Sequence, residues 1–221
     1  MNLTGTNLSF DTASAPISSN GGGTLPTQLD GVSVVVGFIL APVVSVSPTQ
    51  VTFLIPSVLV AGQTNVVLVR DNLQTPPSQI TLLNAAPGLF VVGTLLLAQH
   101  PDGSLITPAS PAQPGESIVV YGAGFGPTNP RQLDGVIPTV RAPILLLSQL
   151  QVLLDGQPLD SSGVQYAGIT PGLAGVYQIG FTLPAGLTDS PMLQIAIGSQ
   201  MSQGGVQIPV AVPLPPFPPE Y

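Results

Sequence analysis

The sequence has few side chains that could support acid–base or metal chemistry. His100 is the one histidine, and cysteine is absent. A structural zinc site needs about four nitrogen or sulfur ligands, and nucleophilic catalysis needs a base held beside an activated nucleophile. No second histidine or cysteine is available to join His100, which stands beside the turn sequence Pro101-Asp102-Gly103. We therefore expect His100 to be an exposed turn residue with no catalytic or metal-binding role.

The acidic residues follow a turn pattern. Four aspartates directly precede a glycine, as turns prefer: Asp30, Asp102, Asp134 and Asp155. Calcium needs several oxygens converging on one point, and no Asp-x-Asp-x-Asp spacing occurs. We expect these aspartates to form turns and no metal site. Two pairings in space stay open at this point, Asp155 with Asp160 and Asp134 with Glu116.

Two other patterns suggest ligand binding at first sight. The run Gly122–Gly126 resembles a phosphate-binding loop, but no helical pattern follows it, which favours a glycine-rich turn or bulge. Five aromatic residues could together form a platform for sugars, yet in a chain without tryptophan we expect most of them in the core or at its ends: Tyr121, Phe125, Tyr166, Tyr177 and Phe181. The sequence thus predicts no catalytic residue, no cofactor and no enzymatic activity.

The composition limits the choice of partners. Only 6% of the 221 residues are charged, lysine is absent, and the net charge is −7. Without a basic cluster, neither nucleic acid nor an anionic membrane surface is an expected partner. Sparse surface charge also weakens the electrostatic barrier to self-association. Three explanations stay open: the chain carries glycans, for which Asn2-Leu3-Thr4 and Asn7-Leu8-Ser9 are sequons, it forms a homo-oligomer or polymer, or it simply tolerates a weakly charged surface.

Targeting signals are not evident in the sequence. The most apolar stretch, Val32 to Val46, is interrupted by Gly37 and Pro42 and is shorter than the ~18 residues that span a bilayer. No membrane insertion is expected. Since cysteine is absent, stability must come from packing, hydrogen bonding and assembly rather than from disulfides.

Short apolar or alternating runs, separated by turn residues, predict an all-β fold of two tandem immunoglobulin-like β-sandwiches. The expected division is a sandwich over residues 1–92, a connector hairpin over 93–113, a second sandwich over 114–213 and a proline-rich tail over 214–221. Strands are expected at 32–36, 39–46, 50–55, 65–69, 79–83, 95–98, 104–107, 116–121, 150–154, 163–166, 177–183, 192–197 and 206–212.

An internal repeat supports this division. Gly5-Thr6-Asn7-Leu8 is similar to Gly122-Ala123-Gly124-Phe125, and Val34–Gly37 is similar to Leu153–Gly156. The longest match aligns Gln50–Pro56 with Gln178–Pro184, and each is followed by a turn glycine. The sequence therefore predicts two copies of one sandwich.

Several separated blocks also resemble a known family. Pro114–Pro127, Asp155–Pro158, Tyr166–Gly168 and Pro171–Ile179 are similar to the Solibacter-type uncharacterised C-terminal domain of acidobacterial secreted proteins. Val46–Val51 and Ala86–Phe90 resemble the upstream half of that family. The resemblance spans nearly all of residues 1–213. It implies an immunoglobulin-like fold of the IPT/TIG type in an extracellular or cell-surface protein, and it implies no enzymatic activity.

One departure from the family pattern suggests a function. The family places an apolar strand before the position of Gly5, and only Met1–Thr4 stands there. We expect the first sandwich to lack most of this strand and to accept one from another chain, as in donor-strand complementation. Residues at that edge are Leu3, Gly5 and Leu8, and the tail offers Leu214, Phe217 and Tyr221. The predicted function is a non-enzymatic extracellular structural protein that assembles into a fibre or surface layer. The alternative is a secreted module that binds glycans or a protein.

Overall fold

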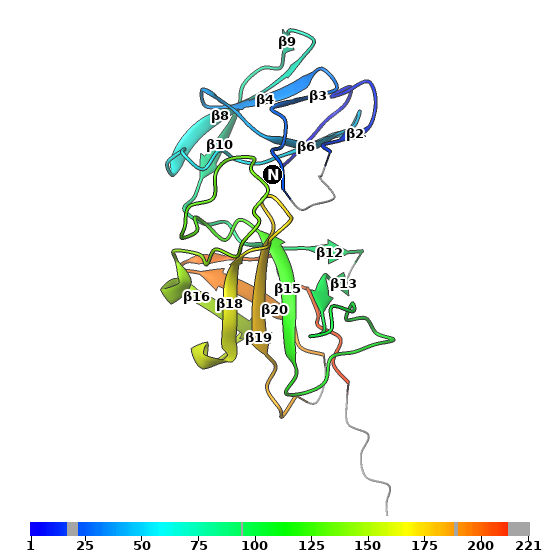
Figure 1. Cartoon of the computed structure of the whole chain (residues 1–221), viewed down its shortest axis with the longest axis vertical. Coiled ribbons are helices and arrows are strands. Elements are labelled where there is room, and N and C mark those ends of the chain that lie inside the picture. The colour runs from blue at the N-terminus through cyan, green and yellow to red at the C-terminus, as the bar shows by residue number, and fades with distance from the viewer. Residues whose placement is uncertain (17–21, 94, 188–189, 212–221) are drawn as a thin grey trace, which may run out of the picture. The chain divides into compact units, whose positions relative to one another are not determined.

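The computed structural model describes residues 1–16, 22–93, 95–187 and 190–211. These residues form an all-β structure of antiparallel sheets, with two short 3-10 helices, η1 (Leu147–Gln149) and η2 (Ser161–Gly163). The all-β fold class is confirmed. The chain forms two compact units (Figure 1). Unit 1 comprises Met1–Ala85, Gly126–Leu145 and Ile169–Val176, and unit 2 comprises the remainder.

Unit 1 contains two sheets. The first has the order β1-β7-β6-β2, with β1 at Asn2–Thr4, β7 at Gln50–Phe53, β6 at Val43–Val46 and β2 at Ala13–Ser14. The second has the order β10-β8-β4-β3, with β10 at Ser78–Leu82, β8 at Gly62–Arg70, β4 at Val32–Val36 and β3 at Gln28–Leu29. Two short strands extend the second sheet, β5 (Ile39–Leu40) beside β4 and β9 (Leu73–Gln74) beside β8.

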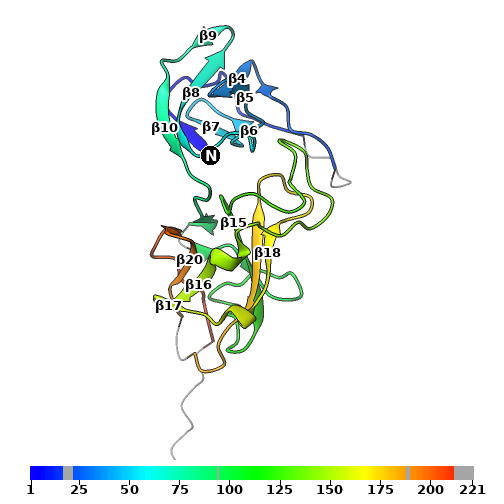
Figure 2. The same ribbon diagram turned by 90° about the vertical axis from the view of Figure 1, so that its left-hand side faces the viewer.

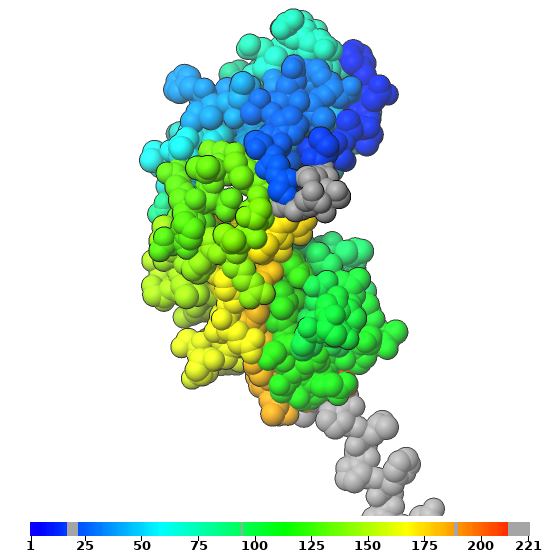
Figure 3. All heavy atoms as spheres, in the orientation of Figure 1, coloured from blue at the N-terminus to red at the C-terminus, as the bar shows by residue number. Residues whose placement is uncertain are grey.

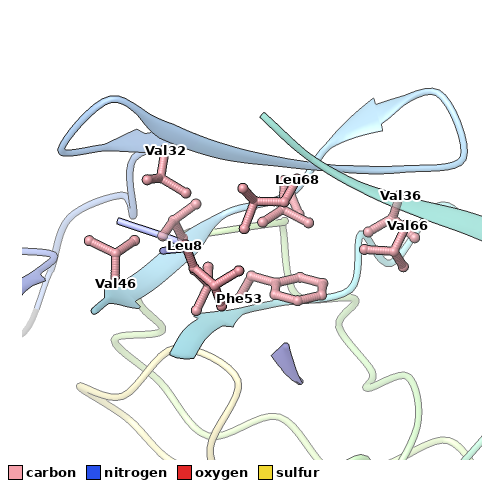
Figure 4. Close-up of a cluster of buried hydrophobic side chains, with 11 residues drawn as sticks. Leu8, Val32, Val36, Val46, Phe53, Val66 and Leu68 are labelled. Carbon is pink, nitrogen blue, oxygen red and sulfur yellow. The ribbon is translucent and has the colours of Figure 1, made fainter. Parts of the chain in front are cut away.

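The core of unit 1 lies between these two sheets. Successive side chains of a strand point to opposite faces, so alternate residues of β4 share one face, and Val32, Val34 and Val36 are fully buried. They meet Val51 and Phe53 from the other sheet in one cluster, part of which is drawn in Figure 4. This packing of two apolar sheet faces is the arrangement of a β-sandwich.

Unit 2 is built in a similar way. One sheet has the order β11-β15-β19-β18, with β14 also beside β15. Its strands are β11 (Gly88–Leu89), β14 (Ala98–Gln99), β15 (Ser117–Ala123), β19 (Tyr177–Thr182) and β18 (Val164–Ile169). The other has the order β17-β16-β20-β21, with β17 at Gln157–Pro158, β16 at Leu150–Leu154, β20 at Leu193–Ile197 and β21 at Gln200–Met201. A small hairpin joins β12 (Val91–Val92) to β13 (Leu95–Leu96).

The two units differ from the expected contiguous domains. Two loops that were expected in the second sandwich, Gly126–Leu145 and Ile169–Val176, belong to unit 1. Leu25 N–H donates to Gly135 O at 2.8 Å, and Ile137 is buried. Figure 3 shows the yellow-green residues of the first loop against the blue residues of unit 1. Sequence patterns do not reveal such long-range packing.

The expected connector is also part of a unit. Ala98 and Gln99 of β14 lie opposite Val120 and Val119 of β15, so residues 93–113 pack into unit 2 rather than link two domains. The predicted hairpin turn is present there, since Gly103 N–H donates to His100 O at 3.0 Å. The strand expected over 206–212 is not a continuous strand in its described part, which holds only single bridges at Gln207 and Val210.

Strand pairing repeats between the units. In unit 1, Leu3 lies opposite Val51 and Thr4 opposite Gln50. In unit 2, Val120 lies opposite Ile179 and Tyr121 opposite Gln178. This register confirms the alignment of Gln50–Phe53 with Gln178–Phe181 and places Leu3 and Thr4 at the positions of Val120 and Tyr121.

A side-chain detail repeats as well. Thr75 Oγ1 accepts a hydrogen bond from Leu68 N–H at 3.1 Å, and Ser202 Oγ accepts one from Ile195 N–H at 2.9 Å. Each hydroxyl residue comes directly after the second strand of a tight hairpin, β8–β9 in unit 1 and β20–β21 in unit 2. The same hydrogen bond, from a backbone N–H to a hydroxyl oxygen, thus stabilises the equivalent hairpin in both units.

One part of the predicted alignment is wrong by a residue. The β4–β5 hairpin turns at Gly37-Phe38, with Val36 opposite Ile39, whereas the β16–β17 hairpin turns at Asp155-Gly156, with Leu154 opposite Gln157. Val36 therefore corresponds to Leu154, and both are buried. Aligning Gly37 with Gly156 shifts the strand by one residue, which would turn its buried side chains to the other face.

Candidate functional site

The outer edge of β1 is the first candidate site. β1 exists, contrary to the expectation that most of this strand is missing, and among the described residues it ends its sheet with β7 as its sole strand partner. The pairing continues beyond the strand, because Phe53 N–H donates to Met1 O at 3.0 Å and Gly5 N–H donates to Thr49 O at 3.1 Å. Figure 2 shows β1 in dark blue beside β7.

The hydrogen-bond pattern shows which backbone groups face outward. Along a strand in a ladder, successive residues direct their N–H and C=O groups to opposite sides. Met1 and Gly5 bond toward the β7 side, so Leu3 does too, and the backbone groups of Asn2 and Thr4 face away from β7. These outward groups form an acceptor for another strand.

The equivalent edge in unit 2 is paired. Tyr121, which corresponds to Thr4, donates its N–H to Leu97 O at 3.2 Å and accepts from Phe90 N–H at 2.9 Å. β11 and β14 together cover this edge of β15. The repeat therefore shows what a complete version of the β1 edge looks like.

The side chains of β1 are more exposed than the side chains at the equivalent positions of β15. Val120 is 0% exposed, whereas its counterpart Leu3 is half-buried. Ile118 is 1% exposed, whereas its counterpart Met1 is 48% exposed. Apolar side chains beside the β1 edge are thus partly exposed to water, whereas the side chains at the equivalent positions of unit 2 are buried.

The predicted edge residues have distinct positions. Leu8 is buried in the unit 1 core, like its counterpart Phe125. Gly5 is exposed at the end of β1, and Leu3 packs against the core from the strand itself. In the first sequon, Asn2 Oδ1 accepts from Thr52 Oγ1 of β7 at 3.0 Å, and in the second, Asn7 O accepts from Arg70 Nη1 of β8. The predicted tail residues Leu214, Phe217 and Tyr221 lie outside the described residues.

A second cluster surrounds His100 in unit 2. His100 Nδ1 lies 2.6 Å from Glu116 Oε1, while Glu116 Oε2 accepts from Gln113 N–H at 2.7 Å. On the other side of the ring, His100 Nε2 lies 3.2 Å from Ser110 O and 3.4 Å from Ser110 Oγ. The imidazole and carboxylate side chains are 14% and 15% exposed, so the expectation that His100 is an exposed turn residue is wrong.

The geometry of this cluster fits an imidazolium that links the hairpin at His100 to Glu116, the residue directly before β15. The hydrogen bond to Glu116 raises the pKa of His100 above its ordinary value. Nε2 is closer to the Ser110 carbonyl than to the hydroxyl, and a carbonyl oxygen can only accept, so Nε2 acts as a donor there. A general base would instead need a free lone pair at Nε2. Sequence reasoning missed this contact because Glu116 and His100 come together only through the hairpin.

The aspartates behave as the turn pattern predicts. Asp30 and Asp155 have positive φ angles, +49° and +50°, and the glycine after each is also left-handed. Asp134 Oδ1 accepts from Ser57 N–H at 2.7 Å, and Asp160 caps η2. Asp155 Oδ1 accepts from Met192 N–H at 2.8 Å rather than meeting Asp160. In the part of the chain that the structure describes, no three His, Cys, Asp or Glu side chains are grouped to hold a metal ion.

The glycine run and the aromatic residues are structural. Gly122 and Ala123 lie in β15, and Gly124, with φ +77°, follows its end, where a side chain would meet the Ala86 carbonyl; no helix follows the run. Phe125 and Phe181 are fully buried, as expected. Tyr177 packs edge-on against Phe125 at 5.5 Å, and burial raises the pKa of its hydroxyl to about 12.

One pocket in unit 1 is apolar. It has a volume of about 110 Å³ and is lined by Leu25, Val44, Ile137, Gly172, Leu173, Ala174 and Val176. None of these side chains is titratable. Such a lining offers no polar group that could orient a substrate. The pocket therefore adds no chemistry to the two sites described above.

Comparison with known proteins leaves the family open. No protein-family model matches the chain, and no curated protein is similar to it in sequence. The resemblance to the Solibacter-type domain thus stays a prediction. Within the described residues, no helix is long and apolar enough to cross a membrane.

Proposed function

We propose that the chain is a non-enzymatic structural protein of the cell surface or extracellular space that assembles by strand complementation at the outer edge of β1. One observation carries this proposal. The outward backbone groups of Asn2 and Thr4 have no strand beside them in the described structure, whereas Tyr121, at the position of Thr4, is paired on that side.

The chemistry of the edge supports the proposal. Natural edge strands are commonly protected by shortness, lysine, proline or inward-pointing charge; β1 is short, with three residues, but contains no lysine, proline or charged side chain. An added strand would satisfy the outward N–H and C=O groups and cover Leu3 and Met1, which are partly exposed. The scarcity of charge over the whole chain leaves little electrostatic repulsion between copies.

Sedimentation velocity and electron microscopy of the purified chain test this function. We expect polymers or filaments at micromolar concentration. Thr4→Pro should abolish them, because it removes the outward N–H while the bonds toward β7 come from Met1, Leu3 and Gly5. Thr4→Val keeps that N–H and should still assemble. A wild-type chain that stays monomeric throughout, or a Thr4→Pro variant that remains folded and assembles normally, would refute the proposal.

A further inference from the structure

Unit 1 has a second open sheet edge, at β10. Among the described residues, β10 ends its sheet, and β8 is its sole strand partner. Its five residues, Ser78–Leu82, include no lysine, proline or charged side chain that would protect an edge. Three of the five are exposed, and Ile80 and Leu82 are half-buried. Unit 1 therefore presents two open edges, β1 in one sheet and β10 in the other.

The hydrogen bonds of β8 show which backbone groups of β10 face outward. Asn65 O accepts from Gly37 N–H at 2.8 Å, so the backbone of Asn65 bonds toward β4. Gln79 lies directly opposite Asn65 and therefore directs its N–H and C=O groups away from β8. Because this direction alternates along a strand, the N–H and C=O groups of Thr81 also face outward.

The equivalent edge of unit 2 is covered. Residues 206–210 occupy the place of β10, because they lie beside β20, the strand that corresponds to β8. Within them, Pro209 takes the position of Thr81, and its carbonyl oxygen accepts from Ala112 N–H at 2.9 Å. In the described part of unit 1, no strand lies on that side of Thr81. One segment, residues 86–113, thus covers both unit 2 edges whose counterparts in unit 1 are open.

The apolar side chains at these equivalent positions also differ in burial. Ile208 is 0% exposed and Val210 is 5% exposed. Their counterparts in β10, Ile80 and Leu82, are only half-buried. A strand added beside β10 would therefore remove apolar surface from water, as a strand added beside β1 would.

The backbone groups of the two open edges match in an antiparallel register. Opposite residues of an antiparallel pair exchange either two hydrogen bonds or none, in alternation. Placing Thr4 of one copy opposite Gln79 of another pairs all the outward groups of both residues. It also brings Asn2 opposite Thr81, with the same result. A slip of two residues along β10 would instead set Thr4 against Pro77, which has no N–H.

The same register matches the side chains. It places Leu3 opposite Ile80 and Met1 opposite Leu82, and directly opposite side chains lie on the same face of a sheet. Leu3 and Ile80 both pack against the unit 1 core cluster, so apolar side chains would meet along the core-facing side of the joined sheet. A slip of two residues in the other direction would set Met1 against the polar Asn84. One register therefore satisfies both the backbone groups and the side chains.

We propose that β10 of one copy pairs antiparallel with β1 of the next copy, with Thr4 opposite Gln79. This rests on the proposed assembly function and adds the partner strand and its register. Pairing of β1 with itself about a two-fold axis also bonds Asn2 to Thr4, but it sets Met1 opposite Gly5, leaves the β10 edges open and stops at a dimer. A β1–β10 contact is heterologous, so it covers both open edges and continues into a filament or a ring.

Thr81→Pro tests the β10 side of this contact. The variant removes an outward N–H, while the bonds toward β8 come from Ser78, Ile80 and Leu82. Sedimentation velocity should show that the variant needs a protein concentration about 10-fold higher, or more, to assemble than the wild type. Thermal unfolding of the same sample shows whether the variant is folded.

A mixture of two proline variants separates this contact from other pairings. Thr4→Pro leaves the β10 edge intact, and Thr81→Pro leaves the β1 edge intact. Each variant alone should be monomeric. Together they should form a heterodimer that does not grow, because the two intact edges come one from each chain. The heterodimer would also show that both variants are folded.

Mixed single-cysteine chains test the register. The chain has no cysteine, so Thr4→Cys and Gln79→Cys each introduce one thiol. Opposite residues that exchange hydrogen bonds have Cα atoms about 5.5 Å apart, so these two chains should form a disulfide on mild oxidation. Asn65→Cys is the matched control, because Asn65 is exposed and lies opposite Gln79, one strand further from the contact. Its mixture with Thr4→Cys should give about a tenth as much disulfide or less.

The outcomes separate this contact from the proposed function. Polymers that persist in folded Thr81→Pro, or a dimer of Thr81→Pro alone, would overturn the β1–β10 contact and leave assembly at β1 standing. Equal yields of the two disulfides would do the same, and this ratio decides if Thr81→Pro does not fold. Wild-type chains that form no polymer at all would refute both proposals.

Discussion

The carbonyl oxygen of Gly88 occupies the space that a side chain at Gly122 would need. Here β11 lies directly against β15, with Gly88 opposite Ala123 and Leu89 opposite Gly122. Gly5 is the glycine of this position in unit 1, where the atoms nearest to an added side chain belong to Leu8 and not to backbone. Under the proposed strand complementation, an incoming strand would make the corresponding approach at Gly5.

The first prediction concerns stability at these two glycines. Gly122→Ala should lower the free energy of unfolding by about 1–3 kcal/mol or more, because backbone must move to admit the methyl group. Gly5→Ala should cost clearly less in the monomer, where only Leu8 must shift. Denaturant unfolding of dilute protein measures both. Equal losses would contradict the structural difference between the two edges.

The second prediction concerns the repeated hydroxyl. Ser202 is 4% exposed and accepts from the buried Ile195 N–H, so Ser202→Ala leaves that donor without a partner and should cost about 1–3 kcal/mol. Thr75 is exposed and its hydrogen bond to Leu68 N–H is only partly buried, so water can reach the freed N–H more easily and Thr75→Ala should cost less. Paired chemical-denaturation curves provide the comparison, and a larger loss for Thr75→Ala would be inconsistent with it.

The third prediction tests the loop that belongs to unit 1. Ile137 is 3% exposed, and Ile137→Ala should destabilise the chain by about 2–5 kcal/mol. Leu133 lies in the same loop but is 68% exposed, so Leu133→Ala should change stability by no more than about 0.5 kcal/mol. Thermal unfolding of the two variants measures this difference in stability. Similar, small effects would mean that the loop is not part of the core.

The fourth prediction concerns pH and His100. Its pKa is raised in the folded state by Glu116, so the imidazolium contact stabilises the fold fully below the unfolded-state pKa of about 6.5. This contribution is lost as pH rises through the higher folded-state pKa. The stability difference between wild type and His100→Gln should therefore shrink over that interval. Glu116→Gln should remove most of this pH dependence, since Glu116 is the largest cause of the raised pKa, and a difference that stays constant with pH would contradict the contact.

Much of the fold follows from local pattern. Val32–Val36 and Leu150–Leu154 were predicted with their observed bounds, because each is a β-branched or apolar run bounded by turn residues. The match of Gln50–Phe53 to Gln178–Phe181 also has the observed register. In these cases side-chain alternation and turns carry the information.

Other features depend on contacts between distant residues. β1 was expected to be largely missing, yet three residues suffice once β7 provides a template. The Gly126–Leu145 loop has no periodicity that assigns it to unit 1, and its place depends on bonds such as Leu25 to Gly135. The His100–Glu116 contact likewise depends on the fold of the hairpin. The open edge at Met1–Thr4 could be predicted from the sequence, but the pairing of β11 and β14 with the equivalent edge of β15 could not.

Amide hydrogen exchange at Thr4 tests the central claim most directly. The Tyr121 amide, bonded to Leu97 O, should exchange slowly at every protein concentration. The Thr4 amide should exchange rapidly in dilute monomer and become protected at least tenfold as the protein assembles. Polymers in which the Thr4 amide exchanges as fast as in the monomer would show that assembly does not use the β1 edge.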